Sequence, residues 1–250
     1  MKYFKIFFLV TIIFSCNSTK QTENNHVNGL ELNKTEIQSN NLVIPPSKKM
    51  ILGKFDYKKD TSFSIIPIKY ANKTIYLNRV VLDSFLKMNE QANKEGLSFT
   101  VISGTRNFSE QKYIWEKKWK RNENDNAKEN ALKILKYSSM PSTSRHHWGT
   151  EIDLNSLNNN YFSKGKGLKE YTWLVKNAHK FGFFQPYTSK IDGRTGYNEE
   201  KWHWSFKPIS NQYLKIYNDS ISYEDINGFL GHETAPIIDV ITNYVNGIEY

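Results

Sequence analysis

Three separated segments carry residue types that together could build a hydrolytic metal site. Ser144–Asp153 contains two adjacent histidines and an aspartate, Glu200–Trp204 contains a glutamate and a histidine, and Ser103–Arg106 ends in an arginine. Two imidazoles and one carboxylate can bind Zn²⁺ and leave a fourth position open to water, as in catalytic zinc sites. A carboxylate three residues before the last histidine could act as general base, and an arginine on another loop could bind an anionic substrate end.

The first segment predicts a loop followed by a strand. Ile152 and Leu154 would face the core, so Asp153 between them would point to the opposite side. His146 lies seven residues before Asp153, and a bend at Gly149 could bring its ring back beside the carboxylate. Taken alone, the segment fits an ordinary surface histidine pair better than a metal site, because spacing is loose evidence for a metal.

The second segment predicts a strand with its aromatic side chains on one face. Trp202, Trp204 and Phe206 share that face, whereas His203 points the other way, toward a cleft. Glu200 precedes the strand, so its direction depends on a loop that the pattern does not predict. A simpler interpretation makes the tryptophans core residues and Glu200 a surface charge, and the core role would itself orient His203.

The third segment is the least specific, since most arginines are exposed and unpaired. Alternating apolar residues from Leu97 to Val101 predict a strand that runs into the loop at Arg106, and strand ends often carry functional groups. Gln111 could add a hydrogen bond. The remaining histidines are interpreted as structural or solvent-facing: His26, His179 and His232.

Together the three segments resemble the signature of the VanY-type D-alanyl-D-alanine carboxypeptidases, zinc peptidases of the hedgehog/DD-peptidase fold. The resemblance runs from about residue 52 to residue 217. The family patterns S-x-H-x6-D, E-x-W-H and S-G-x-R fall on Ser144, His146 and Asp153, on Glu200, Trp202 and His203, and on Ser103, Gly104 and Arg106.

The resemblance implies which residues bind the metal. His146, Asp153 and His203 would be the zinc ligands. The family pattern therefore selects His146 over His147, a choice that the residue types alone leave open.

The resemblance also implies a reaction, the hydrolysis of the terminal D-Ala-D-Ala bond of peptidoglycan stem peptides. Zinc would lower the pKa of water from about 15.7 toward about 7. Glu200 would take a proton from that water and return it to the leaving amine, and Arg106 would contact the substrate and the transition state. Three further residues would line the substrate site: Ser103, Gln111 and Ser144.

Two residues depart from the family pattern. Glu151 stands where small or apolar residues are usual, and on a regular strand its charge would face the site. Lys201 replaces a proline often found between the base and the tryptophan. Both departures could change substrate preference, and neither removes a catalytic group.

Other functions stay open at this point. The same zinc site would serve a D,D- or L,D-endopeptidase that cuts peptidoglycan cross-links. A tethered wall-binding module without catalysis is disfavoured because every ligand and the base are present. A purely structural lipoprotein is a more distant alternative.

The N-terminus predicts export and lipid attachment. Lys2 and Lys5 precede an apolar run over residues 6–14, and a small residue then stands before Cys16. This is the order of an export signal, and a run of about ten residues is too short for the roughly twenty that span a bilayer as a helix. It resembles a bacterial lipoprotein signal with Cys16 as the lipidated residue, because the chain's single cysteine stands at the expected position. An ordinary secretory signal is the alternative.

The composition predicts three parts: a signal peptide over residues 1–15, a lipidated cysteine and polar tether over 16–45, and one zinc peptidase domain over 46–250. The domain would end in a helical extension, 221–250, that packs on the core. The lipid would hold the protein on a membrane, facing the periplasm or cell wall.

The charge of the chain suits an anionic cell envelope. The 250 residues carry a net charge of +9, which falls to +7 when Lys2 and Lys5 leave with the signal. Basic runs such as Lys117–Arg121 are most often solvated helix faces, so we expect no nucleic-acid partner. We also expect a monomer without disulfides.

The remaining patterns predict an α+β fold, a small antiparallel sheet flanked by helices. Asn78 would cap a helix that ends at Gly96, and Thr234 would cap a last helix that Pro236 opens and that runs to Val245. The other expected elements are helices over 108–121, 127–137 and 168–181, and strands over 183–188 and 201–206 joined around Asp192-Gly193.

Overall fold

The computed structural model describes residues 46–122 and 126–249. The expected signal peptide, Cys16 and the tether lie outside this part of the chain, so they stay predictions. Within the described ranges, no helix is both long enough and apolar enough to cross a lipid bilayer.

The main sheet has four antiparallel strands in the order β3-β4-β6-β5. The register between β4 and β6 places Asp153 opposite His203 and Glu151 opposite Ser205. Because side chains alternate between the faces of a strand, these four polar residues share one face. The strands are β3 (Val101–Ser103), β4 (Glu151–Leu154), β5 (Phe183–Phe184) and β6 (His203–Phe206).

The opposite face of these strands is apolar. Ile152 and Leu154 of β4, with Trp204 and Phe206 of β6, pack into a core that also contains Phe85. A shift of β4 by one residue would expose this apolar set and bury Asp153 in the core, so the core holds the register. The predicted inward direction of Ile152 and Leu154 is confirmed.

A small second sheet pairs β1 (Phe63–Ile65) with β2 (Tyr76–Asn78). The α2 helix (Arg79–Asn93) follows at once, and the Asn78 side chain accepts a hydrogen bond from the backbone amide of Val80 at 3.0 Å. The predicted cap is therefore confirmed. The patterns did not predict β1 or β2, because three-residue strands are too short to show a period.

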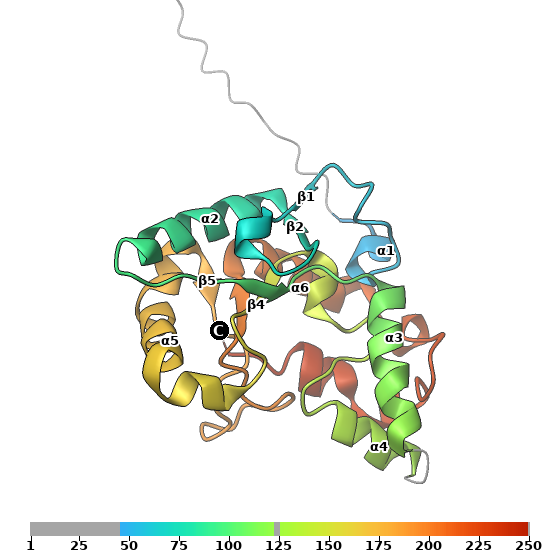
Figure 1. Cartoon of the computed structure of the whole chain (residues 1–250). Coiled ribbons are helices and arrows are strands. Elements are labelled where there is room, and N and C mark those ends of the chain that lie inside the picture. Colours follow the sequence, from blue (N-terminus) through green and yellow to red (C-terminus); the bar gives the residue numbers. More distant parts are fainter. Residues whose placement is uncertain (1–45, 123–125, 250) are drawn as a thin grey trace, which may run out of the picture. The chain divides into compact units, whose positions relative to one another are not determined.

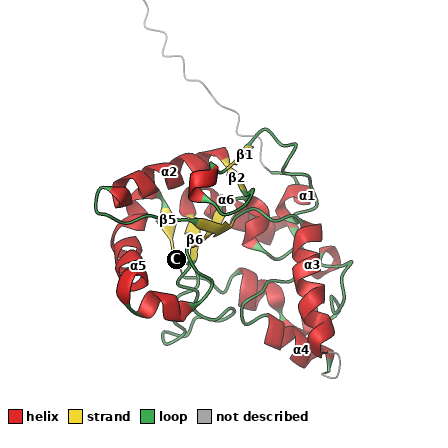
Figure 2. Ribbon diagram, viewed as in Figure 1, coloured by secondary structure: helices red, strands yellow, loops and turns green. Residues whose placement is uncertain are grey.

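Helices surround the short strands (Figure 2). In Figure 1, α2 runs above the strands of the main sheet, α5 lies at their left, and α3 and α4 lie at their right. Asparagine caps begin α3 and α4, and Asn107 and Glu110 form a capping box. The remaining α-helices are α1 (Lys48–Ile51), α3 (Phe108–Trp119), α4 (Ala127–Ile134), α5 (Gly165–Asn177), α6 (Lys207–Ser220) and α7 (Thr234–Ile238).

Shorter helical turns connect these elements. One of them, Arg145–Trp148, contains both histidines of the first segment. A π-helix spans Ile241–Val245. The other turns are 3₁₀ helices: Ile68–Tyr70, Lys120–Asn122, Asn159–Ser163, Ala178–Phe181 and Tyr223–Asp225.

Several predicted boundaries differ from the structure; the strand expected over residues 183–188, for example, covers only Phe183–Phe184. The α4 helix ends at Ile134 rather than Tyr137, because the chain turns there and Tyr137 reaches a cavity. Thr234 is the first residue of α7 rather than its cap, and its hydroxyl donates to the Gly231 carbonyl at 2.7 Å. The last helix is interrupted at Asp239, whose φ of +52° is left-handed. The α6 helix was not predicted at all.

Candidate metal centre and active site

Three side chains from two strands and a helical turn meet at one point. His146 Nε2 lies 3.6 Å from Asp153 Oδ2, and His203 Nδ1 lies 3.0 Å from Asp153 Oδ1. One ligand atom from each residue falls within 4.8 Å of the other two, and all three residues are buried. Two imidazole nitrogens and a carboxylate oxygen are a donor set that fits Zn²⁺.

A backbone carbonyl sets the direction of the His146 ring. His146 Nδ1 lies 2.7 Å from the Gly104 carbonyl oxygen, which can only accept, so Nδ1 carries the hydrogen and Nε2 keeps a lone pair for a metal. Burial, with Arg106 adding to it, lowers the pKa of His146 to about 3, so the ring is neutral at ordinary pH.

The neighbouring His147 has both ring nitrogens engaged inside the fold. Its Nδ1 donates to the Arg106 carbonyl at 2.7 Å, and its Nε2 accepts from the Ser142 amide at 3.1 Å. No lone pair is left for a metal. The geometry thus separates two adjacent histidines that the residue types could not distinguish.

Gly149 makes the bend that was expected between His146 and Asp153. Its φ is +70°, and a Cβ there would lie 2.3 Å from the Phe63 ring and 3.0 Å from the Asn78 amide nitrogen. Glycine is needed both for the left-handed backbone and for the close approach.

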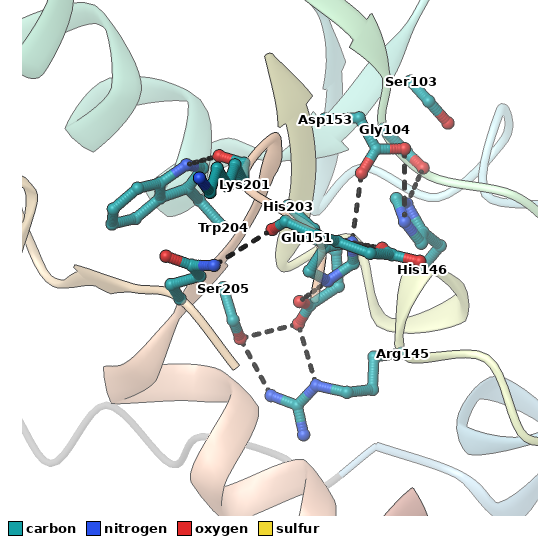
Figure 3. A network of polar contacts seen from close by, with 12 residues as sticks. Ser103, Gly104, Arg145, His146, Glu151, Asp153, Lys201, His203, Trp204 and Ser205 are labelled. Carbon is teal, nitrogen blue, oxygen red and sulfur yellow. Dashed lines mark hydrogen bonds and ion pairs between the residues drawn. The ribbon is translucent and has the colours of Figure 1, made fainter. Parts of the chain in front are cut away.

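His203 lies between two carboxylates. Its Nδ1 faces Asp153 Oδ1, and its Nε2 lies 2.8 Å from Glu151 Oε2 (Figure 3). Burial lowers the pKa of His203, but the hydrogen bonds to Asp153 and Glu151 outweigh it and raise the pKa to about 9. Without a metal, the ring is therefore an imidazolium that holds both acids.

Glu200 reaches the same point from the turn before β6. Its Oε2 lies 3.7 Å from His203 Nδ1, and the side chain is buried. Burial is the largest influence and raises the pKa of Glu200 to about 8; Asp153 also raises it, while His203 and Arg106 lower it. A carboxylate with a pKa near neutrality is suited to take and return a proton.

Arg106 is anchored on the opposite side of the cluster. Its Nε donates to Gln111 Oε1 at 2.9 Å, one Nη1 hydrogen goes to the Ser103 hydroxyl, and Nη1 lies 3.9 Å from Asp153 Oδ2. Gln111 in turn donates to the Ser139 carbonyl at 2.7 Å. The guanidinium is thus held in place before any substrate arrives.

The cluster opens into a cavity of about 750 Å³. Arg106, Gln111 and Glu200 line it together with the three metal-ligand candidates. The described residues around the cavity do not include Ser103, which holds Arg106 instead, or Ser144, which is buried with no described partner for its hydroxyl.

Several cavity residues were missed by sequence reasoning. Trp202 is buried, as expected, but it lies in a turn just before β6, where strand alternation does not apply, and it also lines the cavity. Its place in the E-x-W-H pattern was the available signal. No local signal marked the other missed residues: Ile114, Lys118, Tyr137, Ser138, Ser139, Leu157, Asn158, Asn159, Asn160, Tyr187 and Tyr197.

The two departures from the family pattern have different surroundings. Lys201 lies with its Nζ 5.2 Å from the centroid of the Tyr171 ring and is not among the described residues of the cavity. Glu151 is fully buried beside His203, with the Arg145 guanidinium nitrogen Nε 3.4 Å from its Oε1.

A three-donor cluster with a buried acid and an anchored arginine defines a metallohydrolase type of site on an α+β fold. Residues 74–209 match the VanY family, described as D-alanyl-D-alanine carboxypeptidase, and the chain belongs to that family.

Individual relatives are distant. The chain is 26% identical over 147 residues to YodJ of Bacillus subtilis, which is 58% of this chain and 50% of the relative. It is 26% identical over 133 residues to a D-alanyl-D-alanine carboxypeptidase of Enterococcus faecium, which is 53% of this chain and 38% of that one. The chain therefore spans half or less of the length of these curated relatives.

A solved structure agrees in fold. The LD-carboxypeptidase LdcB superposes with a TM-score of 0.51 and 24% identity, over 67% of this chain and 75% of its own. The expected α+β architecture is thereby confirmed.

Proposed function

We propose that this chain is a zinc-dependent D,D-carboxypeptidase that removes the terminal D-alanine of peptidoglycan stem peptides. The observation that carries the proposal is the convergence of His146, Asp153 and His203 next to the buried acid of Glu200. Membership of the VanY family supports the same reaction.

His146 Nε2, an oxygen of Asp153 and His203 Nδ1 would hold the ion. When bound, zinc supplies Lewis-acid polarisation and brings the pKa of water from about 15.7 toward about 7. Glu200 accepts the proton of the attacking water and then delivers it to the nitrogen of the leaving D-alanine. The Arg106 guanidinium lies close enough to the cluster to stabilise negative charge on the carbonyl oxygen.

The cavity suits the free carboxylate of a peptide end. Arg106 and Lys118 both line it, and Lys118 donates to the Ser138 hydroxyl at the same wall. Burial lowers the pKa of the Lys118 ammonium, while Glu200 raises it, which marks a cation in a partly dry place. Asn158, Asn159 and Asn160 add amide groups able to bind a peptide backbone.

The test is hydrolysis of a muropeptide that ends in D-Ala-D-Ala. The purified protein should release D-alanine, and a chelator should stop the release. A Glu200→Ala variant that retains zinc serves as the matched control. Undiminished release by this variant would overturn the mechanism.

Mass spectrometry of digested cell-wall sacculi separates trimming from cross-link cleavage. A carboxypeptidase removes one D-alanine from pentapeptides, whereas a D,D- or L,D-endopeptidase lowers the amount of cross-linked dimers. A wall-binding protein without catalysis would do neither and would need no stoichiometric zinc.

We also propose that the protein is an exported lipoprotein, a monomer held on the membrane by lipid on Cys16 and facing the periplasm or cell wall. The order of charged, apolar and small residues before this single cysteine supports the proposal. Cys16→Ser should abolish fatty-acid incorporation and release the protein from membranes; unchanged attachment would refute it. Light scattering tests the monomer.

A further inference from the structure

The Nε2 side of the His203 ring lies against charged side chains that are buried inside the fold. Glu151 Oε2 lies 2.8 Å from His203 Nε2, while Glu151 Oε1 accepts hydrogen bonds from the hydroxyls of Ser205 at 2.7 Å and Thr150 at 2.8 Å. Arg145 donates from Nη2 to the same Ser205 hydroxyl at 2.8 Å. Figure 3 shows this chain of contacts running from Arg145 through Glu151 to the ring.

The hydrogen-bond chemistry of the network determines which ring nitrogen is free. A carboxylate only accepts, so Nε2 of His203 must carry the hydrogen that it donates to Glu151. Nδ1 also faces a carboxylate, Asp153, and is then the nitrogen that would exchange its hydrogen for a metal and offer its lone pair to the site. A carboxylate behind a metal-binding histidine acts in this way on both the tautomer and the ring orientation.

Burying this network would be an inefficient way to stabilise the fold. Glu151 is 0% exposed and Arg145 is 1% exposed. Desolvating each ion costs several kcal/mol, and apolar residues of similar volume often serve stability as well or better. The Arg145 guanidinium, with its Nε 3.4 Å from Glu151 Oε1, supplies the opposite charge that this buried acid needs. A buried acid and a buried cation thus stand together where the acid contacts His203, a metal-ligand candidate.

We propose that Glu151, held by Arg145, Ser205 and Thr150, is a positioning residue that fixes the tautomer and orientation of His203 and thereby sets the metal affinity of the site. The inference rests on the proposed metal centre but not on the proposed substrate. It gives a purpose to the charge that departs from the family pattern at this position.

Glu151→Gln tests the proposal without changing the shape of the side chain. The two hydroxyl donors and Arg145 all face Oε1, so the amide oxygen should take that place. The amide NH₂ would then face His203 Nε2, and the ring would have to accept there and carry its hydrogen on Nδ1. The metal would meet the wrong tautomer, an effect of the kind known for an Asp→Asn change behind a catalytic histidine.

Two measurements give the result. Competition with a chromophoric chelator should show zinc affinity lowered by about 10- to 100-fold in Glu151→Gln. In the metal-free protein, ¹⁵N NMR should show that the Nε2 hydrogen of His203 is lost. Zinc affinity within twofold of the unaltered protein, with the Nε2 hydrogen retained, would overturn the proposal.

Glu170→Gln is the matched control. Glu170 has a fully buried carboxylate that accepts from the Tyr161 hydroxyl at 2.7 Å and is not part of the metal-ligand cluster. This variant should lose thermal stability but keep its zinc affinity. If Glu151→Gln and Glu170→Gln lost zinc affinity equally, the loss would reflect lower stability of the fold. That result would also overturn the proposal.

A double variant covers the case in which Glu151→Gln fails to fold. Arg145→Met with Glu151→Leu removes both buried charges together and should fold. It should still bind zinc more weakly, because His203 has lost its acceptor; unchanged affinity would count against the proposal. Tight zinc binding by the unaltered protein without D-alanine release would overturn the proposed peptidase function and leave the role of Glu151 standing.

Discussion

The side chains on the two faces of strands β4 and β6 are similarly buried but are held by different forces. On one face Ile152, Leu154 and Trp204 pack into the core, where each fully buried aliphatic side chain contributes about 1.5–3 kcal/mol. On the other face Asp153 and His203 are also buried, and every charge there has a partner. The apolar face supplies stability and register, and the polar face uses that register to bring reactive groups together.

This difference predicts that substitutions on the polar face lower catalysis or metal binding but leave the protein folded. Substitutions on the apolar face should lower the free energy of unfolding but leave catalysis and metal binding intact. The metal should give the largest effect. Treating the protein with a chelator should abolish D-alanine release, and added Zn²⁺ should restore it, with circular dichroism unchanged in the far ultraviolet. Full activity after verified removal of the metal would show that the polar face does not act through a bound ion.

Loss of the proposed base comes next. Glu200→Ala should lower kcat by about 10²–10⁴, because the proton of the attacking water loses its acceptor. Zinc content, measured by atomic absorption, should stay at one ion per chain. A variant that loses its zinc as well would place Glu200 among the ligands instead.

Arg106→Ala should have a smaller effect, about 10²–10³ in kcat, since one donor to the developing oxyanion is lost. The same change removes the donor to Gln111 Oε1, so KM should rise too. Steady-state kinetics on the muropeptide separate the two effects. Unchanged kcat with raised KM would restrict Arg106 to substrate binding.

The metal affinity of the polar face should also depend on pH. Below about pH 9 the metal-free protein carries a proton on His203 Nδ1, because the raised pKa of this ring keeps it an imidazolium. Zinc must displace that proton, so its apparent affinity should rise about tenfold per pH unit from pH 6 toward pH 9 and level off above it. Titration calorimetry in buffers of different ionisation enthalpy would show one proton released per ion, and a flat profile would contradict the assignment.

The smallest effect belongs to the apolar face. Ile152→Val deletes one methylene from a fully buried side chain and should cost about 0.5–1.5 kcal/mol of unfolding free energy. Thermal denaturation measures this loss. Zinc affinity and kcat of the folded variant should not change; a large change in either would mean that the two faces are coupled.

The local periodicity of the sequence predicted much of the fold. The alternation around Asp153 predicted its direction, Asn78 predicted the start of α2, and the positive φ at Gly149 agrees with the expected bend. Features that depend on contacts between residues far apart in the sequence were predicted incompletely or not at all. Trp202 is buried as expected, but its position in a turn also places it at the cavity. The α6 helix was not predicted, although its buried Tyr217 packs in the core.

The residue types and their alternation along the chain specify the metal donors, the order of these donors and their direction away from the core. Which nitrogen of each histidine is available to a metal depends instead on contacts made in the folded chain. The deciding partners are Gly104 for His146, 42 residues away, and Glu151 for His203, 52 residues away. Spacing along a chain reports the faces of helices and strands, whereas a ring's tautomer depends on whichever acceptor the folded backbone places against it.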